Sequence, residues 1–349
     1  MDLEELKVTD EWTLFEKGKS FMRRMNMFTD TDKNYRMYSG NQWEGAKIEG
    51  IEQAQYNFIE TIVNYKVSTI NQNLWGINYS SENFEDREFR KTAEETCKLL
   101  NKKASKVWEK DSMDFKVREV SEDSAVNDEG VMYVNYDIDT QEPLNEIINK
   151  TDIQYGNENS SDIQSQPYII ISQRKSVIEI QNLARKEGVS EEQIKNIKGD
   201  SDYFEEAGES AKYEKDNKCT LITKMWKEEG KVKFVKSTKY VVVKKESNSG
   251  LSLYPVAHYP WKTKKGSARG EGEVRYLIPN QLELNKTLAR MLLSVKQNAY
   301  PTKVVAIDKI SNPNAINQVG GTIKARGQSV DDVNKVFTTI APAQMSTDV

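Results

Sequence analysis

Hydrophobic residues recur every three or four positions along several stretches of the chain and predict helices there. These helices cover Trp12–Met27, Asn57–Leu74, Glu85–Trp108 and Phe115–Val126. Between the first two, Gly40 interrupts the aromatic segment Tyr35–Trp43 and predicts a turn. The apolar face of the second helix is nearly continuous, which identifies it as a core helix.

Short runs of β-branched and aromatic residues predict strands in the middle of the chain. The runs are Val131–Tyr136, Tyr168–Ile171, Cys219–Trp226, Lys231–Val235 and Lys239–Val243. We expect the last three to form a small antiparallel sheet, with a turn at Glu229-Gly230. The polar segment Thr151–Gln166 predicts an exposed loop, and Ser176–Arg185 and Ser190–Ile197 predict short helices.

The longest predicted helix is Glu273–Ala299, which follows the basic, glycine-containing loop Lys262–Gly272. A proline inside a helix costs about 3 kcal/mol unless it lies in the first turn. Because Pro279 falls within this helix, we expect the helix to begin near Ile278. Short strands are predicted after Pro301, and the whole pattern predicts an α+β fold.

Composition indicates a polar and slightly acidic chain. Its 349 residues include 50 Lys or Arg and 54 Asp or Glu, a formal net charge of -4. Proteins that grip DNA through its phosphates usually carry a basic patch or domain, so we expect any contact with DNA to be local and weak. No stretch approaches the roughly 18 apolar residues that cross a bilayer. The acidic start, Met1–Glu5, does not resemble a secretory signal, so we expect synthesis in the cytoplasm and no membrane contact.

An Asp-x-Asp pair follows the first predicted strand. The spacing of Asp137 and Asp139 can place two carboxylates on one divalent cation. The alternative is a solvated strand end, which we favour because the motif is short and the chain is rich in acidic residues. We therefore predict no metal.

The glycine-containing loop also has two interpretations. Backbone amides of Lys262–Gly272 could cradle a phosphate, but its lysines precede its glycines and do not match Gly-x-x-x-x-Gly-Lys-Ser/Thr. We favour a structural turn whose basic residues contact DNA or a neighbouring subunit. With His258 as the single histidine and no CxxC around Cys97 or Cys219, we predict no catalytic residue and no cofactor, and hence no enzyme.

Several segments, taken in order, resemble portal proteins of tailed bacteriophages. Tyr38-Ser39-Gly40-Asn41-Gln42-Trp43 resembles their Tyr-x-Gly-x-Gln-Trp motif, and the helix from Asn57 follows it as in that family. Asp123–Val134 resembles the family's acidic helix, glycine turn and strand. The most specific similarity is a Tyr-Pro strand, a Gly-x-Gly turn and a helix with Gln and Asn four residues apart. The family-motif positions are Tyr38, Gly40, Gln42, Trp43, Pro255, Gly270, Gly272, Gln281 and Asn285.

The resemblance implies a portal-like fold and a structural function. Residues 1–265 would form a mixed α/β wing domain, 266–299 a stem helix with its preceding loop, and 300–349 the start of a small β-containing clip domain. The remaining stem, tunnel loop and crown are expected to be absent. The function implied is a ring subunit that forms the DNA channel at the portal vertex of the capsid, for genome packaging, retention and ejection and for head-tail joining.

The resemblance also implies partners and site residues. The subunit would form a cyclic homo-oligomer, typically a dodecamer, in the virion, after synthesis in the host bacterial cytoplasm. Double-stranded DNA would pass without sequence preference, and a terminase motor, a scaffold or capsid protein and head-completion proteins would bind. The expected DNA or channel contacts are Lys262, Lys264, Lys265 and Arg269. The expected ring-interface residues of the stem are Leu284, Leu288, Met291 and Val295.

Two other classes remain open. One is another phage head or head-completion structural protein, which would lack the stem helix and clip. The other is a metal-dependent nuclease or packaging-motor subunit that uses Asp137, Asp139 or the glycine-containing loop.

Overall fold

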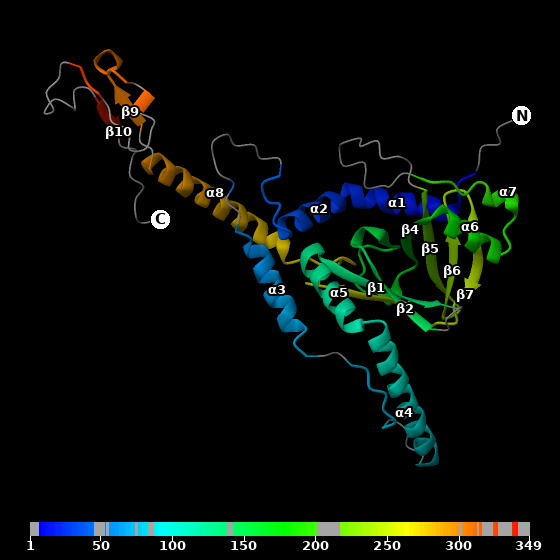
Figure 1. The fold of residues 1–349 in the computed structure, drawn as a ribbon. Helices are drawn as coiled ribbons and strands as arrows, with labels where there is room; N and C mark the ends of the chain where they lie inside the picture. Colours follow the sequence, from blue (N-terminus) through cyan, green and yellow to red (C-terminus); the bar gives the residue numbers. More distant parts are fainter. Residues whose placement is uncertain are drawn as a thin grey trace, which may run out of the picture. The chain divides into compact units, whose positions relative to one another are not determined.

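The computed structural model has an α+β fold with antiparallel sheets (Figure 1). It describes residues 7–44, 53, 56–73, 76–82, 87–137, 142–200, 217–299, 302–312, 314–315, 324–326 and 337–340. The chain forms two compact units: the first comprises Met1–Asn41 and Asn57–Ile278, and the second Gln42–Tyr56 and Pro279–Val349. The expected wing boundary at residue 265 therefore falls inside the first unit. No helix in the ranges given above is both long and apolar enough to cross a membrane.

Helices make up the first part of the chain. They are α1 (Asp10–Arg24), α2 (Met27–Tyr38), α3 (Phe58–Ile70), α4 (Arg87–Lys110) and α5 (Met113–Asn127). The predicted helix over Trp12–Met27 corresponds to α1 but ends at Arg24, because Asn26 adopts a left-handed conformation with φ of 56°. The helix α2 was not predicted. Asn57 caps α3 as its position predicts, since its side chain accepts a hydrogen bond from Glu60 N–H at 3.3 Å.

The larger sheet has five antiparallel strands in chain order. They are β3 (Ile153–Tyr155), β4 (Ile169–Ser176), β5 (Lys218–Glu228), β6 (Lys231–Ser237) and β7 (Val242–Asn248). The antiparallel arrangement of the last three is confirmed, but β7 begins at Val242 and not at Lys239 as predicted, and it extends to Asn248. Glu229 and Gly230 have φ of 51° and 75° and form the predicted turn. At one end, α6 (Val177–Lys186) and α7 (Glu191–Ile194) bury Ile180 and Ile194 against the sheet.

The prediction of an exposed loop over Thr151–Gln166 was wrong. This segment contains η1 (Lys150–Asp152), β3 and η2 (Ile163–Ser165), and it buries Ile153 and Tyr155 in the main core. Its polar residues bind backbone groups within the segment: the buried side chain of Gln166 accepts from Asn157 N–H at 2.8 Å and donates to Asn157 O at 2.9 Å. Polar composition therefore reflects internal hydrogen bonding here.

A three-stranded sheet packs between α5 and the larger sheet. It contains β1 (Glu129–Asp137) between β2 (Glu142–Ile148) and β8 (Val256–Pro260). Val131 and Tyr133 enter the core shared with the larger sheet, whereas Met132 packs against Val120 of α5. The sequence did not predict β2, because its residues include Pro143 and two glutamates that are poor strand formers.

The chain then continues into α8 (Val274–Ala299), β9 (Thr302–Val305), η4 (Ile307–Lys309) and β10 (Phe337–Ile340), and β9 and β10 form an antiparallel pair. The expectation that the helix begins near Ile278 was wrong, since α8 begins at Val274 and contains Pro279. The turn before the proline is anchored from outside the helix, because Glu273 N–H donates to Ala125 O at 2.8 Å. The missing amide of Pro279 removes one backbone hydrogen bond without ending the helix.

Candidate functional site at the start of α8

The loop that leads into α8 folds onto the turn between α5 and β1. Trp261 N–H donates to Asp128 O at 3.1 Å, and Gly272 N–H donates to Asp128 Oδ1 at 2.7 Å. Asp128 itself has φ of 79°, so the turn is held in a conformation that few non-glycine residues adopt. Two of the segments that resemble portal proteins therefore meet in space.

The two glycines of the Gly-x-Gly turn are required by this close approach. A Cβ at position 270 would lie 2.4 Å from Asp128 O, and a Cβ at position 272 would lie 2.9 Å from Ala125 O and from Asp128 N. These contacts involve backbone atoms, which cannot move aside as a flexible side chain would. Gly270 and Gly272 thus permit the loop to contact the α5–β1 turn.

Arg269 anchors the loop from inside the protein. Only 6% of the residue is exposed, and its guanidinium group donates five hydrogen bonds. It binds Glu129 at 2.5 Å and both carboxylate oxygens of Glu158 at 2.9 Å. Two further bonds go to the carbonyl oxygens of Lys150 and Ile153. The bidentate geometry fixes the orientation of the arginine as well as its position.

A cluster of buried charges surrounds this arginine. The side chain of Glu129 is fully buried and shares a hydrogen bond of 3.0 Å with Nε2 of His258. Burial alone would raise the pKa of Glu129, but Arg269 and His258 lower it to about 2. Asp128 and Lys150 form a second buried ion pair. Each of these buried charges therefore has a partner of opposite charge or a hydrogen bond.

The burial of Arg269 corrects one site prediction. We predicted that Arg269 contacts DNA together with three lysines of the same loop, and that prediction was wrong. Its donors are all directed to protein acceptors, and burial leaves its guanidinium inaccessible to a phosphate.

The three lysines do lie on the surface, on a hairpin closed by two backbone hydrogen bonds between Lys262 and Glu271. Lys262 lies 3.4 Å from a carboxylate oxygen of Glu273, and Lys264 lies 3.3 Å from one of Glu271. Lys265 is exposed beside the turn of the hairpin. The loop therefore presents positive charges that neighbouring carboxylates partly neutralise.

A second group of motif residues meets in the second unit. Asn285 donates to Gln42 Oε1 at 2.6 Å, and Gln281 donates to Asn285 Oδ1 at 2.9 Å and to Tyr56 O at 2.7 Å. Gln281 and Asn285 are 3% and 2% exposed. Since residues four apart share one face of a helix, their spacing allows α8 to bind the segment that contains Gln42.

Three of the remaining motif residues, Tyr38, Gly40 and Pro255, lie in the first unit, and Trp43 lies at the start of the second. The Tyr38 hydroxyl bonds to side chains of α3 and α5 at 3.1 and 2.9 Å, and its carbonyl accepts from Asn57. Gly40 has φ of 90° and makes the predicted turn. Pro255 O accepts from β1 at 2.9 Å, and Trp43 is half-buried.

The predicted stem residues differ in exposure along α8. Leu284 and Leu288 are half-buried, whereas Met291 and Val295 are 49% and 64% exposed. Leu292 beside them is 40% exposed. The last half of the helix therefore carries apolar side chains in contact with solvent.

Sequence reasoning did not identify the acidic partners of Arg269. Glu158 lies in the segment predicted to be an exposed loop, and no local pattern marks it. The acidic pair Asp128-Glu129 before a strand was a visible signal, but its role was not recognised. In the described ranges no group of three or more His, Cys, Asp or Glu is placed to hold a metal ion. The side chain of Asp137 and all of Asp139 lie outside those ranges.

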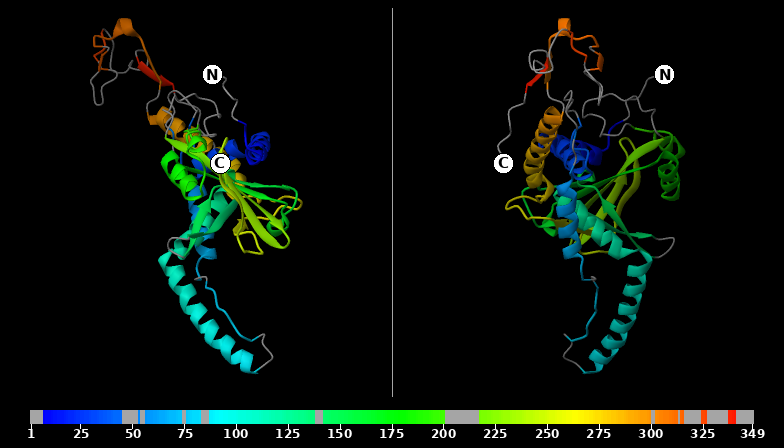
Figure 2. Two further views of the ribbon diagram at one scale, coloured as in Figure 1. Left: turned by 90° about the vertical axis from the view of Figure 1, so that its right-hand side faces the viewer. Right: turned by 60° about the vertical axis from the view of Figure 1, so that its left-hand side comes forward.

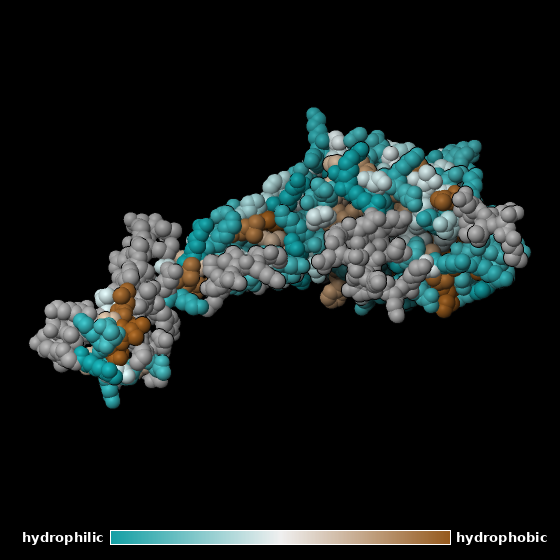
Figure 3. All heavy atoms as spheres, turned by 90° about the horizontal axis from the view of Figure 1, so that it is seen from above, coloured by the Kyte–Doolittle hydropathy of each residue, from teal (hydrophilic) through white to brown (hydrophobic). Residues whose placement is uncertain are grey.

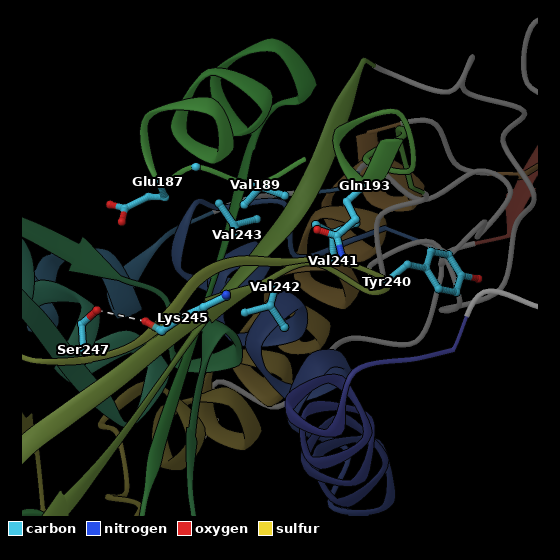
Figure 4. Close-up of a pocket in the computed structure, with 10 residues that line it drawn as sticks. Glu187, Val189, Gln193, Tyr240, Val241, Val242, Val243, Lys245 and Ser247 are labelled. Atoms are coloured by element: carbon cyan, nitrogen blue, oxygen red, sulfur yellow. Dashed lines mark hydrogen bonds between the residues drawn. The ribbon is translucent and has the colours of Figure 1, made fainter. Parts of the chain in front are cut away.

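The two cysteines and a groove beside the larger sheet lie elsewhere. Cys219 is 3% exposed and burial raises the pKa of its thiol to about 12, whereas Cys97 is half-buried. A groove of about 490 Å³ runs between the α6–α7 turn and the edge strand β7 (Figure 4). Val189, Val241 and Val243 contribute to its lining, which contains none of the predicted site residues.

No protein-family model and no curated protein sequence matches this chain. The functional argument therefore depends on the contacts described above. They join motif segments in pairs: the acidic turn with the Gly-x-Gly loop in the first unit, and Gln42 with Gln281 and Asn285 in the second.

Proposed function

We propose that this chain is a subunit of a portal ring, a cyclic homo-oligomer through which double-stranded DNA enters and leaves a phage capsid. The role is structural and not catalytic. The ring would belong to the virion and would bind a packaging motor, a scaffold or capsid protein, and head-completion proteins. The finer portal-like description, with a wing, a stem and a clip, is part of the same proposal.

The observation that carries the proposal is the contact between the Gly-x-Gly loop and the acidic α5–β1 turn. Each of the two segments resembles portal proteins through a motif of its own, and Gly272 and Asp128 are 144 residues apart in sequence. If the two resemblances arose by chance, nothing would require the two segments to contact each other. Their direct hydrogen bond supports the interpretation that both motifs belong to one portal-like fold.

The exposed part of α8 supports assembly. Met291, Leu292 and Val295 present apolar surface to solvent, and a helix face of this kind usually has a partner. Figure 3 shows apolar patches separated by hydrophilic side chains over the visible face of the molecule. Head-to-tail contacts that close into a ring would bury such patches in every subunit.

The charge of the chain supports a conduit for DNA. Each Lys or Arg that neutralises a phosphate adds affinity that depends on salt, and dense contacts would hold the DNA in place. The chain carries a net charge of -4, and Lys262 and Lys264 lie beside carboxylates. Such a surface supports passage of DNA without tight binding.

Electron microscopy and mass photometry of the purified protein test the proposal. We expect rings with a central hole and masses that are multiples of 40.1 kDa. Met291→Asp with Val295→Asp should reduce assembly, whereas Leu253→Asp, at a site 60% exposed outside α8, should not. A parent protein that stays monomeric at every concentration would contradict a portal function.

A further inference from the structure

One face of α4 is covered by the chain segment that precedes it. Tyr79 N–H donates to Asn101 Oδ1 at 2.7 Å, and the Asn101 amide donates to Tyr79 O at 3.1 Å and to Asn78 Oδ1 at 2.9 Å. Figure 2 shows this extended stretch beside α4, in the cyan part of the chain. Ala93, Cys97 and Ala104, at helical spacing from Asn101, are half-buried on this face.

The opposite face of α4 combines apolar and basic side chains. Leu99 on this face is 71% exposed, whereas Leu100, four residues before Ala104, borders the covered face. The exposed lysines at spacings of four and five residues are Lys98, Lys102, Lys103 and Lys106. None of these lysines forms an ion pair with a carboxylate in the part of the chain that the structure describes. We call this surface, Lys98–Lys106, the basic face of α4.

The charge of α4 is opposite to that of the rest of the chain. Arg87–Lys110 contains eight Lys or Arg and four Glu, a net charge of +4. Since the whole chain carries -4, the remainder carries -8. Taken as a whole, the surface of a second copy outside α4 is therefore acidic and attracts the basic face.

One acidic surface of suitable kind lies on α5. Glu119, Glu122 and Asp123 share one face of this helix and form no ion pairs with other described residues. Glu119 is exposed, whereas Glu122 and Asp123 are half-buried, and Glu122 accepts a hydrogen bond from the Tyr38 hydroxyl at 2.9 Å. Burial raises the pKa of Asp123 to about 6, and the negative charges of Glu119 and Glu122 add to the effect. Lysines from another subunit would relieve this repulsion.

We propose that the basic face of α4 docks on an acidic surface of a second copy of this chain and so contributes to a subunit interface. A second copy fits better than nucleic acid, because Leu99, which is 71% exposed, stands among the lysines. Aliphatic side chains gain little beside a phosphate backbone, whereas a protein interface buries them and removes apolar surface from water. The inference rests on the proposed ring for its geometry, since a head-to-tail contact uses two different surfaces of each subunit.

Two variants of α4 and a matched control test the inference by mass photometry and sedimentation velocity over a dilution series. The variants are Leu99→Asp, and Lys102→Glu with Lys106→Glu. The control is Ile178→Asp on α6, where the side chain is 62% exposed. We expect both α4 variants to raise the concentration of half-dissociation by about tenfold or more, and the control to match the parent. Circular dichroism should show equal helix content, since all the changed side chains lie on the subunit surface.

The outcomes separate this inference from the portal function. If the α4 variants assemble as rings at the same concentrations as the parent, the inference is overturned and the ring proposal stands. If the parent forms only dimers, and Leu99→Asp dissociates them, the α4 interface stands and the portal function fails. A parent that remains monomeric overturns both. Loss of short duplex DNA binding by Lys102→Glu with Lys106→Glu, without any change in assembly, would assign the basic face to nucleic acid instead.

Discussion

Replacement of Arg269 by methionine tests whether the buried charge cluster holds the start of α8 in place. Methionine fills similar space but removes five hydrogen bonds and the positive charge. Among the residues that the structure describes, Glu129, whose side chain is fully buried, would then keep only His258 as a partner. Glu158 is 17% exposed and can regain some contact with water.

The expected loss follows from the unpaired Glu129 carboxylate. Removal of one member of a buried ion pair lowers the free energy of unfolding by roughly 3–5 kcal/mol. We expect a loss near the middle of this range, about 4 kcal/mol, because Glu158 is partly relieved by solvent. When Glu129→Gln is added to Arg269→Met, the buried negative charge disappears, so the double variant should be more stable than Arg269→Met alone.

The pH dependence gives an independent check. In the parent, the pKa of Glu129 is about 2, below the value near 4.5 for an ordinary glutamate. A lowered pKa contributes stability that is present above about pH 4.5 and is lost as the pH falls toward 2. Arg269→Met removes the main cause of the lowered pKa, so its deficit relative to the parent should shrink over this same interval.

Urea unfolding followed by circular dichroism and tryptophan fluorescence measures these changes. Lys265→Met is the matched control, because Lys265 is exposed on the same loop and should change stability by less than about 0.5 kcal/mol. A loss below about 1 kcal/mol for Arg269→Met would refute the reasoning. So would a double variant whose loss equals the sum of the two single losses.

Three further variants test other parts of the structure by the same unfolding measurement. Gly270→Ala should cost roughly 1–3 kcal/mol because its Cβ meets backbone at 2.4 Å, whereas Gly76→Ala, with nothing within 4 Å, should not destabilise. The pKa of Asp123 is raised to about 6, so the charged carboxylate destabilises the folded protein once the pH has risen through 6. Asp123→Asn should therefore stabilise the protein by about 2 kcal/mol at about pH 8 and change its stability little below about pH 4. Asn285→Leu should cost roughly 1–3 kcal/mol, since Gln42 and Gln281 lose a buried partner; no loss would show that this network does not stabilise the second unit.

The sequence predicts elements where local pattern and tertiary context agree. The helices α3 and α5 and the strands β5 and β6 bury apolar side chains, and the apolar pattern of the sequence predicts each of these elements. The pattern fails where buried groups are polar, as in the segment around Gln166. Hydrogen bonds between side chains and the backbone satisfy such groups, and the spacing of apolar residues in the sequence does not predict these bonds.

The same limit applies to the candidate site. The glycines at 270 and 272 could be selected from sequence by their resemblance to the Gly-x-Gly turn of portal proteins, and a Cβ at either position would meet backbone atoms. The role of Arg269 could not be selected, since its partners Glu129 and Glu158 are 140 and 111 residues away. An arginine among loop lysines has the composition of a surface patch, and only the fold distinguishes the buried member from the exposed ones.

The buried charge cluster before α8 fixes the position of its loop more precisely than apolar contacts alone would. Apolar contacts alone allow neighbouring elements to slide, whereas an arginine that binds two carboxylates and two carbonyl oxygens admits one orientation. Val274 and Ile278, in the first turns of α8, are buried in the first unit. The part of α8 that belongs to this unit is therefore held by apolar contacts, while the charge cluster fixes the loop that precedes it.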